Sequence, residues 1–582
     1  MKRLLKNTNT TFGGLYFMAV MNLLFMHYQF LFTIALESEC FKTSIFDNIN
    51  ACLLDTTIIL AILYLLTLKR LRISLIATFF ITLIWSFCNT LYARFFSQYI
   101  SLSAIEQAGN LADDFMINSM LAGIRAIDLY YPLFAGIFIF FLIKTKNRDI
   151  SKGWQKILCI IWSAALFLGV SVHSLYAFHP EKTIETVLEK TILLSPRTDA
   201  MWPNWTVFHR GALRTLFLDH LFVSEKLKLT KEDKNEIEQE YTDYRYRVTK
   251  RTAPDNIKNV IFILVESYLS VSSDLIVDGK EITPNLNRLK HDSTVYFNGH
   301  MQPNVSIGES SDGQLIYMAG LLPLHSEITV TKAKKIKVFG LPEQIKKQIP
   351  TLKSYTLIPT NPTLWEQQGM TEAYGFDYLY STLDYQADFE YNKKGDYLSD
   401  EKIFKYAALK DKSITSPFFS LILTFSMHQP YDTYEEHGFH LTDKNLPEKY
   451  RNYLTSCHYT DAQIGKYLDI LRERGIYDKS LIVIVSDHDA RPKYIDMDGI
   501  VPPEIPLYII NGGIDKTKVW NGVCNQLDVY TTILDILGIE SKWRGLGHTL
   551  LNTNYQNSVT DKIQKISSNI INSDFFGTEK QN

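Results

Sequence analysis

The first 180 residues consist of long apolar runs separated by short polar loops. Five runs are long enough, or nearly so, to cross about 30 Å of hydrocarbon as helices. The expected spans are residues 15–36, 51–68, 73–92, 127–143 and 157–178. The first run is long and lacks a small-residue cleavage site, which indicates an anchor rather than a removed signal peptide. The pattern predicts a transmembrane domain of five helices over residues 1–180.

Basic residues indicate on which side of the membrane each loop lies. Lys2, Arg3 and Lys6 precede the first span, and Lys and Arg also cluster between spans two and three and between spans four and five. The other two loops are poorer in basic residues for their length. The positive-inside rule puts the N-terminus in the cytoplasm, and an odd number of spans puts everything after Phe178 outside. We expect a multi-pass protein of a bacterial-type cytoplasmic membrane with an extracytoplasmic C-terminal half.

A set of polar residues lies within the spans or at their margins, where such groups are costly in lipid. It comprises Asn22, His27, Gln29, Asp55, Asn89, Asp128 and His173. Two interpretations stay open for these residues. They mark a cavity for a lipid headgroup, or they form hydrogen bonds between helices and lie at the interface.

The rest of the chain divides into three parts. Residues 181–256 contain amphipathic segments suited to a membrane surface and then a densely charged stretch typical of a solvated helical linker. Over residues 257–552 short apolar runs alternate with amphipathic helices, which predicts an α/β domain with a largely parallel sheet. Its expected strands are residues 260–265, 418–425, 481–485 and 506–510, and its expected helices are residues 285–290, capped by Thr283-Pro284, and 461–474. Residues 553–582 are polar and predict a peripheral helix or a loose tail.

Three of these strands end in residues that can bind a metal ion. The first ends at Glu266, another runs into Asp487-His488, and a third runs into His428. Ligands of open parallel sheets lie beyond the carboxyl ends of the strands. Glu266, Asp487 and His488 form an oxygen-rich set with one nitrogen, which suits Mn²⁺, Mg²⁺ or Zn²⁺. The alternative is that they are ordinary polar residues at strand ends.

A hydroxyl suited to nucleophilic attack precedes the apolar, helix-like run 314–322. Ser310 and Ser311 would lie where the helix dipole and unpaired N–H groups favour a developing anion. Coordination to the metal would lower the pKa of such a hydroxyl and activate it. The alternative is that either serine simply caps the helix.

Composition excludes several classes of protein. A chain of 582 residues with 60 basic and 62 acidic side chains has more than one domain and too little positive charge to bind nucleic acid by neutralising phosphates. Six cysteines without a C-x-x-C pair argue against a zinc ribbon or a thioredoxin-like site. Cys457 and Cys524 can form a disulfide if their domain is extracytoplasmic.

Three motifs in this order carry a family resemblance: Val265-Glu266-Ser267-Tyr268, then Gly308-Glu309-Ser310-Ser311-Asp312, then Ser486-Asp487-His488. They resemble the signatures of the lipoteichoic acid synthase-like phosphotransferases, which are sulfatase-like members of the alkaline phosphatase superfamily. The resemblance implies that Glu266, Ser310, Asp487 and His488 bind the metal and that Ser310 is the covalent nucleophile. It also implies that His428 contacts the substrate phosphate or the leaving group.

The chain departs from the family pattern at two places. The family's usual nucleophile is threonine, whereas this chain has Ser310. The family also presents an arginine to the glycerophosphate near Trp365, whereas here Trp365 is followed by Glu366-Gln367, and a neutral amide cannot make the bidentate contact. Arg491, which follows the Asp487-His488 pair, is our candidate for the missing positive charge, with Lys493 as the alternative.

The expected function is therefore transfer of a phospholipid headgroup of the phosphoglycerol type, through a covalent phospho-serine, to a glycan or lipid acceptor in the cell envelope. Its cofactor is expected to be one divalent ion, Mn²⁺ or Mg²⁺, with Zn²⁺ as the alternative. Three other functions stay open: a phosphoethanolamine transferase, a membrane-tethered phosphodiesterase or sulfatase-type hydrolase, and an inactive sulfatase-like scaffold. The hydrolase is disfavoured for sulfate esters because the sequence has no Cys/Ser-x-Pro-x-Arg motif.

Overall fold

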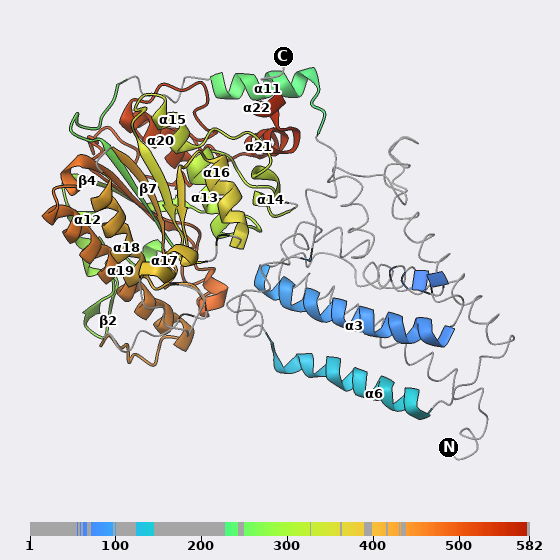
Figure 1. The fold of residues 1–582 in the computed structure, drawn as a ribbon. Coiled ribbons are helices and arrows are strands. Elements are labelled where there is room, and N and C mark those ends of the chain that lie inside the picture. The colour runs from blue at the N-terminus through green and yellow to red at the C-terminus, as the bar shows by residue number, and fades with distance from the viewer. Residues whose placement is uncertain are drawn as a thin grey trace. The chain divides into compact units, whose positions relative to one another are not determined.

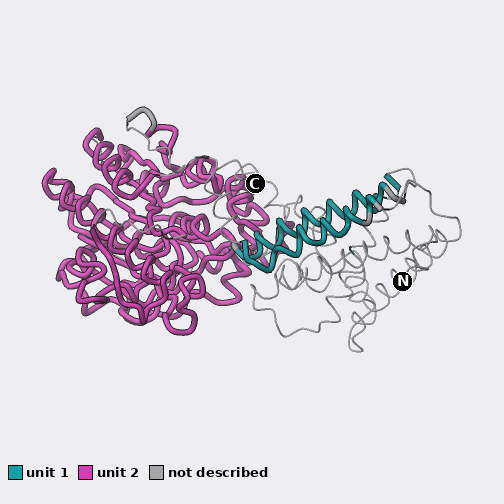
Figure 2. Tube along the Cα trace, turned by 90° about the horizontal axis from the view of Figure 1, so that it is seen from below, with its two compact units in different colours: residues 1–106, 118–225 teal, residues 107–117, 226–582 magenta. Residues whose placement is uncertain are grey.

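The computed structural model divides the chain into two compact units (Figure 2). The first comprises residues 1–106 and 118–225, and the second comprises residues 107–117 and 226–582. The structure describes residues 71–96, 99–100, 124–144, 227–242, six single positions between 55 and 66, and 250–578 except 326, 361, 363, 389–397, 415–416, 430 and 432–437.

Two of the expected spans are described in the first unit, and both are helical. Helix α3 (Leu71–Phe96) covers the third expected span, and its stretch Ile73–Arg94 is long and apolar enough to cross a membrane. Helix α6 (Tyr130–Lys144), preceded by the 3₁₀ turn η2 (Ala126–Leu129), covers most of the fourth. The first and fifth expected spans and most of the second lie outside the described residues.

Helices α3 and α6 contact each other through aromatic rings and one ion pair. The rings of Phe79 and Phe138 stack with centroids 3.9 Å apart. Arg94 at the end of α3 donates two hydrogen bonds, of 2.6 and 2.8 Å, to the buried carboxylate of Asp128. For Asp128 the interhelical interpretation is thus the one observed, because its carboxylate is already occupied by a guanidinium.

The second unit is built around a central sheet. Among the described residues it has eight strands in the order β10 (Cys524–Asn525), β4 (Val295–Gln302), β9 (Ile505–Ile510), β8 (Ser480–Ser486), β1 (Asn259–Val265), β7 (Phe418–Leu423), β5 (Lys353–Leu357) and β6 (Tyr378–Tyr380). All pairs are parallel except those that β9 makes with β4 and β8. The four predicted strands are confirmed, and β1, β7 and β8 are almost wholly buried, as expected of strands covered on both faces.

Helices cover both faces of the sheet (Figure 1). One group consists of α12 (Pro284–His291), α18 (Asp400–Ser413) and α19 (Glu448–Glu473), and the other of α13 (Ser310–Ala319), α15 (Leu341–Lys346) and α20 (Asp528–Leu537). Shorter elements are η3 (Ser270–Ser272), the hairpin of β2 (Ile276–Val277) and β3 (Lys280–Glu281), α14 (Val330–Ala333), η4 (Leu364–Glu366), α16 (Gln367–Ala373), α17 (Thr382–Asp388), η6 (Tyr477–Lys479) and η7 (Pro492–Ile495).

The C-terminal segment folds onto the charged segment that follows the expected spans. Helix α21 (Asp561–Ser573) buries Ile563, Ile566 and Ile570 and continues into α22 (Phe575–Thr578). Helix α11 (Lys231–Thr242) packs against α21. Lys562 on α21 pairs with Glu240 on α11 at 2.7 Å. The expectation of a peripheral helix is therefore the one observed for residues 561–573.

The helix predicted over residues 461–474 is longer in the structure, where α19 begins at Glu448. The predicted cap of α12 is wrong. The Thr283 side chain makes no capping bond to α12. The N–H groups of Asn285 and Leu286 donate instead to the carboxylate of Asp461 on α19, at 3.0 and 2.8 Å, so a distant side chain caps the helix. The disulfide that the sequence left open between Cys457 and Cys524 is not formed, because both are free buried thiols.

Candidate active site

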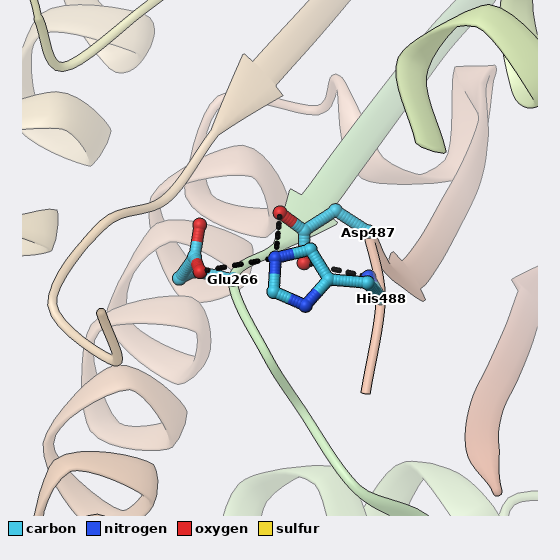
Figure 3. A group of neighbouring side chains, drawn as sticks. All are labelled: Glu266, Asp487 and His488. Atoms are coloured by element: carbon cyan, nitrogen blue, oxygen red, sulfur yellow. Dashed lines mark hydrogen bonds and ion pairs between the residues drawn. The ribbon is translucent and has the colours of Figure 1, made fainter. Parts of the chain in front are cut away.

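Glu266, Asp487 and His488 lie together at the carboxyl ends of two adjacent strands (Figure 3). The register of β1 and β8 pairs Val265 with Ser486, so the residues that follow emerge side by side. The Nε2 atom of His488 is 3.4 Å from Oε1 of Glu266 and 3.6 Å from Oδ2 of Asp487. The three possible ligand atoms all lie within 4.8 Å of one another, and all three residues are buried.

The Ser310 hydroxyl lies beside this cluster at the first residue of α13. Its Oγ donates to Oε2 of Glu266 at 3.3 Å and is 3.2 Å from Nε2 of His488. The helix begins four residues earlier than the apolar run suggested, so Ser310 itself occupies its positive end. Helix α13 also approaches β8 very closely, because a Cβ on Gly313 would lie only 2.3 Å from the carbonyl oxygen of Asp487.

The side chains of the cluster are fixed by their neighbours. The backbone N–H of Ser267 donates to Oδ1 of Asp487 at 2.8 Å, and its hydroxyl donates to Oε1 of Glu266 at 2.8 Å. The Nδ1 atom of His488 is 2.7 Å from the carbonyl oxygen of Asp489. Because a carbonyl only accepts, Nδ1 carries a proton, and Nε2 is the nitrogen that faces the carboxylates.

The charges in the cluster shift one another's pKa values. Burial alone would raise the pKa of Glu266, but the hydrogen bond to His488 and its charge hold this pKa below its usual range. Burial would lower the pKa of His488, but Asp487 and Glu266 raise it. Burial and the neighbouring Glu266 raise the pKa of Asp487. Two buried carboxylates side by side are therefore stabilised either by a positive charge between them or by a proton on Asp487.

A divalent cation fits this donor set. Two carboxylates, one imidazole nitrogen with a fixed tautomer and one hydroxyl converge on one point, and oxygen-rich sets with one nitrogen suit Mn²⁺, Mg²⁺ and Zn²⁺. A cation would replace the proton that the carboxylates otherwise hold on Nε2 of His488. The structure brings together all four residues expected to bind the metal.

His428 lies in the turn after β7 and is half-buried. Its ring stacks on Phe425 at 4.9 Å, and its Nδ1 is 2.7 Å from the carbonyl oxygen of Gln429. The turn is held by Asp400 on α18, whose Oδ1 accepts from the N–H groups of Phe425 and Ser426 at 2.8 and 3.0 Å. Strand β7 pairs with β1, and the N–H of Glu266 donates to the hydroxyl of Thr424 after β7 at 2.9 Å, so the turn that carries His428 lies at the sheet edge of the cluster.

The other expected substrate contacts have different surroundings. Trp365 lies in η4 with a φ of 51°, and the adjacent Glu366 pairs with Lys334 at 2.6 Å. Arg491 forms an ion pair with Glu309, so the guanidinium expected to bind phosphate is already engaged by a carboxylate. Substrate contacts of Trp365 and Arg491 stay predictions.

Three residues of this site were not singled out from the sequence. Glu309 precedes the serine and pairs with Arg491. Asp312 is buried in the first turn of α13, where its Oδ2 accepts from the N–H groups of Ser306 and Gly308, both at 2.9 Å. Glu309 and Asp312 both lie in the motif that contains Ser310, and their place in this motif could have identified them as site residues. Asp400 is 28 residues before His428, and no local pattern connects the two.

Comparisons with known proteins match both parts of the chain. A family model described as the lipoteichoic acid synthase N-terminal domain matches residues 1–190, and the sulfatase model matches residues 258–539. Lipoteichoic acid synthase 2 of Bacillus subtilis is 26% identical over 492 residues, which are 78% of this chain and 70% of the relative. Lipoteichoic acid synthase of Staphylococcus aureus is 25% identical over 485 residues, which are 78% and 71% of the two chains. The crystal structure of the synthase LtaP from Listeria monocytogenes is 19% identical, with a TM-score of 0.45 over 58% of this chain and 82% of the other.

Proposed function

This chain belongs to the lipoteichoic acid synthase-like family of sulfatase-like phosphotransferases, and from that premise we propose its reaction. It transfers a phosphoglycerol-type headgroup from a phospholipid, through a covalent phospho-Ser310, to a glycan or lipid acceptor in the cell envelope. The observation that carries the proposal is the position of the Ser310 hydroxyl. It lies within 3.3 Å of both Glu266 and His488, at the positive end of α13.

The proposed metal ligands are Glu266, Asp487, His488 and the Ser310 oxygen. A divalent cation bound there would lower the pKa of the serine hydroxyl and offset negative charge on the phosphoryl group. Ser267 fixes both carboxylates, and Asp489 fixes the imidazole, so the ligands are already oriented. The N–H groups of Ser311, Asp312 and Gly313 donate to the carbonyl oxygens of Gly308 and Glu309, so they do not bind the substrate. The positive end of the helix dipole at Ser310 favours negative charge on the transferring group.

The exchange proceeds in two steps. The Ser310 oxygen attacks phosphorus, the bond to the diacylglycerol oxygen breaks, and the serine proton is lost as the diacylglycerol alcohol gains one. An acceptor hydroxyl then attacks the same phosphorus, releases Ser310, and gives up the proton that the serine regains. We assign proton transfer at the leaving oxygen to His428, because the turn that carries it lies at the same sheet edge as Glu266. Trp365 is the proposed contact for the headgroup.

A lipid donor follows from the proposed topology. The family model of residues 1–190 supports anchoring in the membrane, and α3 is long enough to span it. With the catalytic unit outside, no nucleotide pool supplies an activated phosphate. A phospholipid reaches the site by diffusion in the bilayer, and its phosphodiester bond supplies the free energy for the exchange.

The test uses the full chain in nanodiscs with Mn²⁺. The donors are phosphatidylglycerol labelled in the headgroup glycerol and phosphatidylethanolamine labelled in the ethanolamine, and the adduct is mapped by mass spectrometry. We expect labelled Ser310 from phosphatidylglycerol, none in Ser310→Ala, and a slower adduct in Ser310→Thr because the hydroxyl remains. Label from phosphatidylethanolamine would make the enzyme a phosphoethanolamine transferase. Turnover of a soluble ester without any lipid adduct would make it a hydrolase, and no reaction at all would favour a scaffold.

A further inference from the structure

Glu309 and Arg491 join the loop of the proposed nucleophile to the loop of the proposed metal ligands. Glu309 immediately precedes Ser310, and Arg491 lies three residues after His488. Nη2 of Arg491 forms an ion pair with Oε1 of Glu309, and the two side chains are only 22% and 14% exposed. Solvent therefore screens this pair little, and removing one partner leaves a nearly buried charge.

The ion pair lies on the Nδ1 side of the His488 ring, opposite the Nε2 atom that is proposed to bind the metal. Oε2 of Glu309 is 3.9 Å from Nδ1 of His488, whereas Nε2 on the other side of the ring faces Ser310 and Glu266. The guanidinium is also held from its other end, because Nη1 of Arg491 donates to the hydroxyl of Tyr494 at 3.3 Å. Arg491 thus has partners on both sides before any substrate binds.

Both residues hold a strained backbone. Their φ angles are 46° for Glu309 and 44° for Arg491, in a region that is unfavourable for residues with a Cβ atom. Such conformations persist only where the surrounding contacts fix them, and they gather at functional sites. Here the strained residues of the two loops contact each other.

We propose that Glu309 and Arg491 form a clamp that sets the position of Ser310 relative to Glu266, Asp487 and His488. The proposal rests on the proposed function for its chemistry. In the clamp, Glu309 and Arg491 are positioning residues that act through Ser310 and His488. Arg491 is then not the phosphate contact that its position in the sequence suggested. The clamp keeps the hydroxyl and the imidazole on the same cation site while substrate enters and leaves.

The experiment compares single removal with exchange of the two charges. The variants are Glu309→Gln, Arg491→Gln and the double variant Glu309→Arg with Arg491→Glu, all in the full chain in nanodiscs. The control is Glu343→Gln, because Glu343 pairs with Lys337 at 2.6 Å with a similar exposure of 28% and 29%. Two quantities are measured: Mn²⁺ affinity of the metal-free chain by calorimetry, and the rate of Ser310 adduct formation against phosphatidylglycerol concentration.

We expect each single variant to bind Mn²⁺ about 10- to 100-fold more weakly and to form the adduct more slowly by a similar factor. The phosphatidylglycerol concentration at half-maximal rate should change by less than about twofold, because neither residue contacts the lipid. The double variant should recover most of both losses, because it restores one negative and one positive charge at the two positions. Glu343→Gln should change neither quantity.

A different pattern overturns the clamp. If Arg491→Gln raises the half-saturating lipid concentration and leaves Mn²⁺ affinity unchanged, Arg491 binds the phosphate instead. If the single variants leave both quantities unchanged, the ion pair has no positioning role, whether or not the double variant folds. The Mn²⁺ titration also distinguishes the clamp from the proposed transfer reaction. A loss of Mn²⁺ affinity in the single variants supports the clamp even if no lipid forms an adduct with Ser310.

Discussion

Backbone strain in this protein gathers beside the residues proposed to act in catalysis. Ser267 directly follows Glu266 with a φ of 52°, and Glu309 directly precedes Ser310 with a φ of 46°. At Ser267 the strained turn has a visible use, because it directs one N–H to Asp487 and the hydroxyl to Glu266. The strain is therefore part of the geometry that brings two carboxylates together.

A buried carboxyl group away from the site predicts a pH dependence of stability. Asp411 on α18 is buried and accepts hydrogen bonds from the hydroxyls of Tyr355 and Tyr467. Burial raises its pKa from 3.8 to about 6. Between these values the folded state holds a proton that the unfolded state loses, so the stabilisation is complete below about pH 4 and lost as the pH rises through 6.

We therefore expect the stability of Asp411→Asn, relative to the wild type, to increase by about 2 kcal/mol when the pH rises from 4 to 7. The measurement is urea denaturation of the full chain in detergent at both pH values. Asp377→Asn is the control of opposite sign. Burial alone would raise the pKa of Asp377, but the hydrogen bonds from Lys346 and Ser354 and the charge of Lys346 together lower it. A difference between wild type and Asp411→Asn that is the same at both pH values would show that Asp411 titrates normally.

At the scale of elements, the sequence predicted what local patterns encode. The four strands and α12 were found, because buried strands read as continuous apolar runs between turn signals. The clustering of Glu266, Asp487 and His488 was predicted correctly because strand ends of a parallel sheet lie at one edge. The reversed direction of β9 was not found, since strand direction depends on chain crossovers that an apolar run does not record.

The features that the sequence did not predict depend on contacts between segments that are far apart in the chain. The cap of α12 comes from Asp461, 176 residues away from Asn285. The turn that carries His428 is held by Asp400 on another helix. The start of α13 was misplaced because Ser310, Ser311 and Asp312 are polar, although Ser311 and Asp312 are buried there. A pattern of apolar residues cannot locate an element whose buried residues are polar.

The close contact between α13 and β8 gives a prediction at this scale. A methyl group at Gly313 would lie 2.3 Å from the Asp487 carbonyl oxygen, so α13 must move away from the strand. We expect Gly313→Ala to slow Ser310 adduct formation by at least about 100-fold, because a displacement of about 1 Å has that effect. Gly369→Ala is the control, because its new methyl group would meet only the flexible side chain of Lys334. An unchanged rate in Gly313→Ala would mean that the spacing of α13 and β8 does not matter for catalysis.

At the scale of the whole molecule, membrane topology and active-site chemistry explain each other. The N-terminal family domain supports an anchor, and the catalytic unit carries a site suited to opening a phosphodiester bond. Within the second unit, helix α11 buries Ile237 and Tyr241 and contacts α21 through several ion pairs. An extracytoplasmic catalytic unit stays a prediction from the basic residues of the loops.

The central claim is that Ser310 shares one divalent cation with Glu266, Asp487 and His488. Anomalous diffraction from crystals of the full chain grown with Mn²⁺ tests it most directly. We predict one strong peak at about 2.0–2.3 Å from an oxygen of each carboxylate, Nε2 of His488 and Oγ of Ser310. Saturating Mn²⁺ without a peak at this cluster, or with a peak that Ser310 does not reach, would contradict the account.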